Sequence, residues 1–307
     1  MRILVTGGSG LIGGRLVPAL VADGHTVSRL VRARPRAARE FRWSPESGLL
    51  DPASLAGCEA VIHLAGASLA AGSWDDERRA EILGSRVAGT RLLAAAMARA
   101  TPPPATLVCA SAVGIYGDRG EEVLSEASGP GAGFLAEVVR AWEAEAAIAA
   151  QAGVRVLHLR FGMVLARHAG ALPRLVLPFR FGLGGHLGSG RQWLSWITLD
   201  DVVGVVRHVL ARGDLAGPVN VVSPGPVTSR DLARALGGVL GRPVWMPIPA
   251  WALRFALGQM GEELLLFSQR AVPARLRASG FAFAHGAIEG ALRHVLRGRL
   301  DDGGSPA

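Results

Sequence analysis

Short apolar runs alternate with longer segments of helical spacing along the first half of the chain. The apolar runs predict strands at residues 2–6, 26–31, 59–64, 105–110 and 154–160, with a short further strand around Phe41 and Trp43. The longer segments predict helices at residues 11–23, 76–101 and about 134–151. Because strands that alternate with helices form parallel sheets covered on both faces, the pattern predicts an α/β fold.

The second half of the chain is less regular. Glycines cluster between residues 182 and 190. Asp200 and Asp201 are expected to cap a helix that runs to about residue 212, because carboxylates accept hydrogen bonds from the free N–H groups of a first helical turn. A strand at residues 218–222 and a helix near 229–240 follow, and then a proline-rich link and further helix.

Composition places the chain among globular proteins. Hydrophobic residues make up 50% and charged residues 19% of its 307 residues, which excludes a disordered or fibrous protein. The net charge is +8, and all 33 basic residues are arginines. These arginines are scattered and form no stripe interleaved with aromatic residues, so we expect no nucleic-acid partner.

Cysteine content and the length of the apolar runs exclude further classes. The two cysteines, Cys58 and Cys109, are too few for a disulfide framework and lack the neighbours of a zinc site. No apolar run reaches the ~18 residues that a membrane span needs, and the start of the chain does not resemble a signal peptide. We therefore expect a cytoplasmic protein with no membrane partner and no metal site.

A glycine-rich loop joins the first predicted strand to the first predicted helix. In this loop Gly7, Gly10 and Gly13 have the spacing G-x-x-G-x-x-G. In dinucleotide folds one such glycine makes a tight turn, one lets the backbone approach a pyrophosphate, and one lets helix and strand pack closely. The pyrophosphate then faces the helix N-terminus, where free N–H groups favour an anion. The alternative is an ordinary glycine turn.

The end of the second predicted strand indicates which dinucleotide binds. A site for NAD(H) would place Asp or Glu there to bond the ribose 2′-hydroxyl. The strand instead ends at Val31 and Arg32, with no acid before Glu40. Arg32 can pair with a 2′-phosphate, and the Ser9 hydroxyl can add a hydrogen bond. NADP(H) is therefore the expected cofactor; the alternative for Arg32 is a solvated surface arginine.

These motifs and several later ones resemble a known family. The glycine loop, the strand end His63-Leu64-Ala65-Gly66 and residues 111–117 resemble extended short-chain dehydrogenases/reductases of the NAD-dependent epimerase/dehydratase superfamily. Gly84-Ser85-Arg86, Trp142-Glu143 and residues 184–197 are similar to its atypical subgroup of epimerase family proteins, family 39U. The resemblance implies a Rossmann core with a doubly wound parallel sheet, bound NADP(H) and a C-terminal domain of unassigned role.

The resemblance also implies cofactor contacts and a domain division. The implied contacts are Gly7, Gly10, Leu11, Ile12 and Gly13 in the loop, Val31 and Arg32 after the second strand, Leu64 and Ala65 after the fourth, Glu81 and Arg86 on the long helix, and Leu165. We expect residues 1–165, completed by 199–222, to form the NADP-binding domain. Residues 166–198 and 223–300 are expected to form a smaller α+β substrate domain, followed by a frayed tail at 301–307.

The acid–base pair of the superfamily is missing from this chain. Other members carry Tyr-x-x-x-Lys on the helix after the fifth strand, whereas this chain has no lysine and one tyrosine. Alignment on Glu143 puts Leu135 and Val139 at the two positions, and neither can transfer a proton. Ser111 is the candidate to polarise a substrate carbonyl. Tyr116 is the candidate proton donor, and the alternative for it is a packing residue.

Two functions fit these features. The first is an NADP(H)-dependent oxidoreductase or epimerase that acts on a carbonyl or sugar-like small molecule, with residues 182–197 covering the nicotinamide. The second is a protein that holds NADP(H), or senses its redox state, without turnover. Glu143 is expected to pair with an arginine, and Arg160 or Arg191 could meet an anionic substrate. The helices at 76–101 and 134–151 are candidates for a homodimer interface.

Overall fold

A central eight-stranded sheet organises the computed structural model, which describes residues 1–297. In spatial order the strands are β12 (Gly217–Val221), β8 (Arg155–Phe161), β6 (Thr106–Ala112), β5 (Ala60–His63), β1 (Arg2–Thr6), β2 (Thr26–Val31), β3 (Glu40–Ser44) and β4 (Leu49–Leu50). All neighbours pair in parallel except β4, which runs antiparallel to β3 at the edge. The predicted α/β fold with a doubly wound parallel sheet is confirmed.

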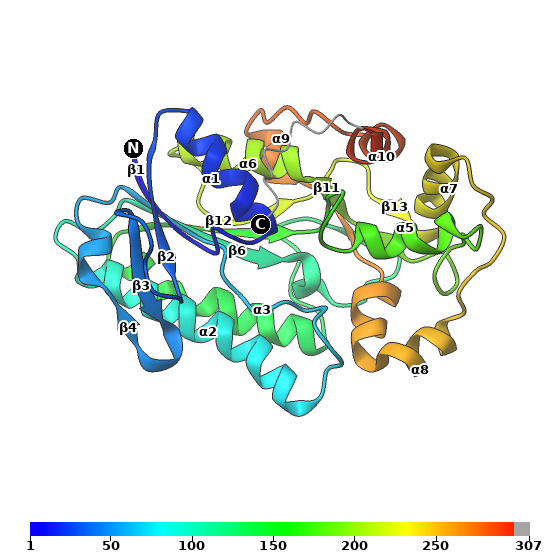
Figure 1. Cartoon of the computed structure of the whole chain (residues 1–307), viewed down its shortest axis with the longest axis horizontal. Helices are drawn as coiled ribbons and strands as arrows, with labels where there is room; N and C mark the ends of the chain where they lie inside the picture. Colours follow the sequence, from blue (N-terminus) through cyan, green and yellow to red (C-terminus); the bar gives the residue numbers. More distant parts are fainter. Residues whose placement is uncertain (298–307) are drawn as a thin grey trace.

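Helices cover both faces of this sheet (Figure 1). One face carries α1 (Leu11–Ala22), α6 (Leu199–Ala211) and the short α9 (Ala274–Ala278). The opposite face carries α2 (Asp76–Arg99), α3 (Phe134–Glu145) and α4 (Ala147–Gln151). The segment predicted as one helix over residues 134–151 is therefore two helices, and the break falls at Ala146.

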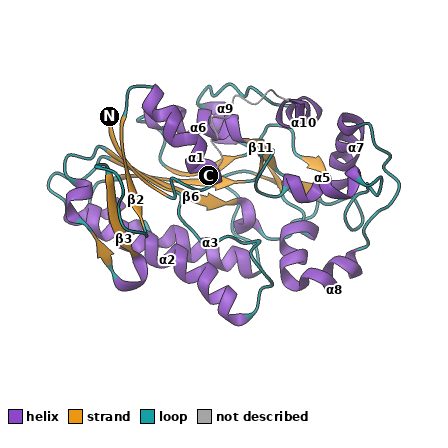
Figure 2. Cartoon of the chain, viewed as in Figure 1, coloured by secondary structure: helices purple, strands orange, loops and turns teal. Residues whose placement is uncertain are grey.

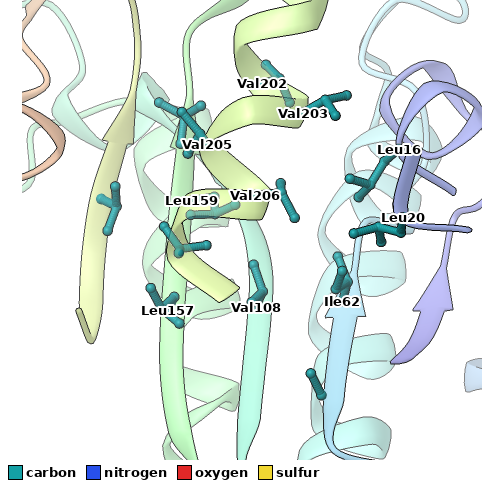
Figure 3. Close-up of a cluster of buried hydrophobic side chains, with 14 of the residues drawn as sticks. Leu16, Leu20, Ile62, Val108, Leu157, Leu159, Val202, Val203, Val205 and Val206 are labelled. Carbon is teal, nitrogen blue, oxygen red and sulfur yellow. The ribbon is translucent and has the colours of Figure 1, made fainter. Parts of the chain in front are cut away.

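The strands are apolar on both faces because both faces are covered. In β6, Val108 faces the helices α1 and α6, while its neighbour Leu107 faces α2 and α4. Figure 3 shows the first of these cores, in which valines of α6 pack over Leu157 and Leu159 of β8. Continuous apolar strands of this kind hold the carboxyl ends of β1, β5 and β6 in fixed positions at one edge of the sheet.

A second, smaller core lies beyond that edge (Figure 2). It is built mainly from α5 (Leu172–Arg180), α7 (Ser229–Leu240) and α10 (Ile288–Arg297). Three two-stranded ladders lie outside the main sheet: β9 (Met163–Leu165) with β11 (Trp196–Thr198), β10 (Trp193–Leu194) with β13 (Val227–Thr228), and β7 (Val123–Leu124) with β14 (Arg270–Ala271). The helix α8 (Ala250–Gly261) continues into a π-helical turn at Glu262–Leu266.

Not every residue of the expected C-terminal domain stays in this second core. Leu276 of α9, together with Phe281 and Phe283, packs on the same core as α1 and α6. The chain thus returns to the main sheet before α10 joins the smaller core. The tail expected at residues 301–307 lies outside the described residues.

The start of α6 corrects one expectation from the sequence. The N-cap residue is Thr198, whose hydroxyl accepts a hydrogen bond from the Asp201 N–H at 3.1 Å. Asp200 and Asp201 instead lie in the first turn. Asp201 is buried, and its carboxylate accepts hydrogen bonds from the N–H groups of Ala284 and His285 at 2.8 and 3.1 Å. Within residues 1–297, no helix has the length and apolar character needed to span a membrane.

Candidate functional site

The glycine loop folds tightly against the end of β5. Gly7 has a φ of +67°, and a Cβ at this position would lie 2.8 Å from backbone atoms of Leu64 and Ala65. A Cβ at Gly13 would overlap the carbonyl oxygen of Gly7. These two glycines therefore allow a backbone approach that any side chain would block.

The N-terminus of α1 is open to an anion. Its N-cap residue is Gly10, which provides no side-chain cap, and the first turn of this helix contains no acidic residue. Ser9 and Gly10 are exposed, and Leu11 and Ile12 are half-buried. Free N–H groups at a helix N-terminus attract phosphate, so the loop has the form that a pyrophosphate requires.

Thr6 and His63 fix the backbone beside this loop. The Thr6 hydroxyl accepts hydrogen bonds from the N–H groups of Leu64 and Ala65 at 3.1 and 3.2 Å. It also forms a hydrogen bond with Nδ1 of His63 at 2.7 Å. Burial, with the nearby charge of Arg86, lowers the pKa of His63 to about 4. His63 is therefore a neutral interior residue that positions the strand end.

The first acidic residue after β2 in the sequence is already paired within the protein. Val31 is the last residue of the strand, and Arg32 follows it on the surface. Glu40 accepts hydrogen bonds from the Arg29 guanidinium and from the Arg36 N–H, both at 2.7 Å. Both oxygens of Glu40 are thus held by the protein, while Arg32 is exposed beside the site.

Two candidate residues on α2 have different surroundings. Glu81 is exposed and forms an ion pair with Arg78. Arg86 is half-buried, donates to the carbonyl oxygens of Ile82 and Ala67 at 3.0 and 3.1 Å, and lies over the ring of Trp142. Burial, together with the charge of Arg78, lowers the pKa of Arg86 to about 10. Arg86 therefore secures the segment after β5, and Glu81 faces solvent.

Leu165 lies at the end of β9 and is fully buried in the smaller core. Its backbone and its side chain are both buried, with an exposed fraction of 0%. Close by, Gly170 approaches the side chain of Leu11 in the glycine loop. The segment after β9 thus covers part of that loop.

The two residues at the positions of the missing acid–base pair lie in the interior. Leu135 and Val139 of α3 are both buried, and they pack in separate apolar clusters. The N-terminus of α3 is capped by Glu263, whose carboxylate accepts hydrogen bonds from the N–H groups of Phe134 and Leu135 at 2.9 and 2.8 Å. An acid from the region after α8 therefore holds the helix end where other family members place their tyrosine.

Ser111 and Tyr116 belong to one buried polar network. Ser111 donates to Glu143 at 2.5 Å, and Arg160 donates to both oxygens of Glu143 at 2.9 and 2.8 Å. Arg160 also donates to the Tyr116 hydroxyl at 3.1 Å, and that hydroxyl lies 2.7 Å from Oδ1 of Asn220. The expectation that Glu143 pairs with an arginine is confirmed.

Burial and charge define the state of this network. Burial raises the pKa of Glu143, but the hydrogen bonds from Arg160 and Ser111 outweigh it, so that the pKa is lowered overall. Burial raises the pKa of Tyr116, and Arg160 only partly offsets this. Tyr116 is completely buried. Its phenol therefore packs inside the protein, and the Ser111 proton is directed at a carboxylate.

Residues 182–197 are held firmly by their own contacts. Gln192 donates to the carbonyl oxygens of Leu187 and Leu265 at 3.0 and 2.9 Å. The indole N–H of Trp193 donates to Glu121 at 2.6 Å, and Arg270 lies over the Trp193 ring. These contacts hold the segment against the π-helical turn and β14.

Sequence reasoning missed Glu263 and Asn220, and it assigned Arg160 to a substrate anion. Arg160 is instead neutralised by Glu143. The pairing of β8 with β6 and β12 places Arg160 between Ser111 and Asn220. No local signal marks these residues, because their partners lie up to 129 positions away.

The open parallel sheet, the glycine turn and the uncapped helix N-terminus together define a dinucleotide-binding protein of the Rossmann class. The chain belongs to the NAD dependent epimerase/dehydratase family, whose profile matches residues 3–222. A second profile, a domain of unknown function termed DUF1731, matches residues 248–295. The family resemblance seen in the sequence is thereby confirmed.

Full-length relatives support this assignment. The chain is 42% identical over 293 residues to an epimerase family protein of Mycobacterium bovis, covering 95% of this chain and 97% of the relative. It is 36% identical over 304 residues to the epimerase family protein YfhF of Bacillus subtilis, covering 97% and 99%. The crystal structure of human epimerase family protein SDR39U1 (isoform 2) with NADPH aligns with a TM-score of 0.88 and 32% identity, covering 97% of this chain and 100% of that one.

Proposed function

We propose that this protein binds NADP(H) in preference to NAD(H). The observation that carries the proposal is the engagement of Glu40, the first acidic residue after β2. Both oxygens of Glu40 are engaged by Arg29 and Arg36, so Glu40 does not offer a free carboxylate to a ribose 2′-hydroxyl. Arg32 is exposed at the same strand end, where its guanidinium can pair with a 2′-phosphate. The human relative solved with NADPH supports this choice.

The remaining cofactor contacts follow from the loop and the strand ends. Gly7, Ser9, Gly10, Leu11, Ile12 and Gly13 would face the pyrophosphate, with Val31, Leu64, Ala65 and Leu165 beside the two ribose groups. Arg86 would act by holding the segment after β5. We place Glu81 at the rim of the site, because its side chain is exposed and paired with Arg78.

We propose that the protein holds NADP(H), or senses its redox state, without turning over a substrate. Leu135 and Val139 are buried and apolar, Tyr116 is sealed in the interior, and the Ser111 hydroxyl donates to Glu143. These placements leave the family's usual positions without a group that transfers a proton. NADP(H) binding is therefore the function that the site supports best.

Cofactor titration tests this proposal directly. The full chain is titrated with NADPH and with NADH in a calorimeter, alongside Arg32→Ala. Loss of a charge-assisted bond worth about 1.5–3 kcal/mol should weaken NADPH by ten-fold or more and leave NADH unchanged. Arg99→Ala is the matched control, because Arg99 is an exposed arginine at the C-terminal end of α2 and is not among the candidate cofactor contacts. Equal affinity of the native protein for both cofactors contradicts the proposal.

Hydride transfer to a carbonyl or sugar-like compound is the second candidate function. The observation that favours it is the position of Ser111 at the carboxyl end of β6, the edge of an open parallel sheet where ligands bind. NADPH oxidation with a panel of carbonyl compounds tests it, with Ser111→Ala expected to lower any rate by about 10²–10⁴. If the native protein turns over none of these compounds, the result favours a protein that binds the cofactor without catalysis.

Two further proposals concern organisation. We assign the substrate-domain role to residues 166–198 and 223–300, whose helices α5, α7 and α10 build the smaller core. We also expect a homodimer through the outer faces of α2 and α3, where Leu83 is exposed. Light scattering of the purified protein at several concentrations tests the dimer, and a monomeric mass throughout would contradict it.

A further inference from the structure

Three side chains of types that bind metal ions converge outside the set of candidate cofactor contacts. Asp200 lies in the first turn of α6, His285 in the segment before α10, and His294 on α10 itself. Each offers one ligand atom, and these three atoms all lie within 4.8 Å of one another. Neither the cofactor contacts nor the Ser111 network uses any of them.

The Asp200 carboxylate is oriented toward the two imidazoles. Its Oδ1 accepts long hydrogen bonds from Nε and Nη2 of Arg15 at 3.4 and 3.3 Å. Its Oδ2 lies 2.8 Å from Nε2 of His294. One oxygen is thus held by an arginine, as in the outer shell of many metal sites, while the other faces the histidines.

Hydrogen bonds to its backbone hold His285 beside the other two side chains. Its N–H donates to the buried carboxylate of Asp201 at 3.1 Å, and its carbonyl oxygen accepts from the Ser223 hydroxyl at 3.3 Å. The rings of His285 and His294 stack with centroids 4.2 Å apart and an angle of 24° between their planes. An ion pair between Asp200 and His294 does not require this second imidazole, whereas a metal site does. Because an imidazole binds a metal in the plane of its ring, His294 must rotate out of this stack to share an ion with His285.

The donor set selects the class of ion. Two imidazole nitrogens and one carboxylate oxygen suit Zn²⁺ and similar transition metals, whereas Mg²⁺ and Ca²⁺ prefer oxygen ligands alone. Tetrahedral Zn²⁺ with bonds of about 2.0 Å places its ligand atoms about 3.3 Å apart. Asp200 and His294 are each more than two-fifths exposed, so rotation of these side chains can close the remaining distance and leave one position for water.

We propose that Asp200, His285 and His294 form a binding site for a divalent transition metal of the zinc class. The ion would join α6 of the main sheet to α10 of the smaller core. A short sequence motif cannot predict this site, because Asp200 and His294 are 94 residues apart. The expectation of no metal site came from cysteine spacing alone.

Calorimetry with Zn²⁺ alone tests the proposal on the full chain, after treatment with a chelator that is then removed. One ion per chain is expected to bind. His285→Gln and His294→Gln should each weaken this binding by about ten-fold or more. His168→Gln is the control, because His168 is an exposed histidine outside the cluster and its loss should change nothing.

Co²⁺ provides a second readout at the same site. The native protein with Co²⁺ should show visible absorption bands typical of low coordination number, and His294→Gln should lose them. If His285→Gln does not fold, Asp200→Asn and His294→Gln replace it, both at exposed positions. Absence of Zn²⁺ binding, or equal affinity in the native protein and in the folded variants, overturns the proposal.

Discussion

The carboxylate of Glu263 accepts a hydrogen bond from the backbone N–H of Leu135 at 2.8 Å. A second bond from Phe134 N–H, at 2.9 Å, completes the cap of α3. This relationship couples the π-helical turn after α8 to the helix that carries the acid–base pair in other family members. The helix is thus held in place by the C-terminal region, although its two key positions are apolar.

Glu263→Ala is expected to destabilise the protein. The change removes a cap and leaves two buried N–H groups without partners, which should lower the free energy of unfolding by about 2–3 kcal/mol. Urea unfolding measures the loss. The neighbouring Glu262→Ala is the control, because its ion pair with Arg254 is exposed and should contribute less than about 1 kcal/mol. Equal effects of the two changes would contradict the capping role.

Two substitutions in the glycine loop separate binding from folding. Gly10→Val should fold, because a Cβ there meets only the Gly7 carbonyl at 3.3 Å, but its side chain would occupy the place expected for the pyrophosphate. NADPH binding should therefore be lost. Gly14→Ala is the matched control, since no atom lies within 4 Å of its Cβ position. It should bind NADPH as the native protein does, and Gly10→Val with native affinity would refute the loop assignment.

The buried imidazole of His63 should make stability depend on pH. Its pKa is lowered to about 4 in the folded protein and is near 6.5 in the unfolded chain, so the unfolded chain binds more protons between these values. Stability should fall as the pH drops below 6.5, by about 2 kcal/mol at pH 5. Urea unfolding at pH 7.5 and 5 measures the change. His63→Gln should show a smaller decrease, and an identical decrease would exclude His63 as the source.

Tyr116→Phe should affect stability and leave the cofactor site intact. The lost hydroxyl deprives Arg160 and Asn220 of a buried hydrogen-bond partner, which should lower the free energy of unfolding by about 1–3 kcal/mol. NADPH affinity should stay within a few-fold of the native value. A large loss of NADPH affinity in a folded variant would instead show that Tyr116 supports the cofactor site.

Local pattern was sufficient for the main sheet and the nucleotide loop. The apolar runs at residues 2–6, 26–31 and 105–110 predict strands because both faces of a covered parallel sheet exclude water, and each observed strand lies within two residues of its prediction. The glycine spacing predicts the loop because steric limits on Gly7 and Gly13 act within a few residues. The absence of lysine alone excludes the usual acid–base pair.

Only the tertiary structure decided what the polar side chains do. The register of β6, β8 and β12 brings Ser111, Arg160 and Asn220 side by side. Glu143 reaches them from α3, and Tyr116 from the turn after β6. The cap from Glu263 and the cluster of Asp200 with His285 and His294 likewise depend on how distant segments pack. Burial and hydrogen-bond partners, which set proton affinity and access to ligands, arise from these long-range contacts, whereas periodicity and glycine spacing report only on neighbours along the chain.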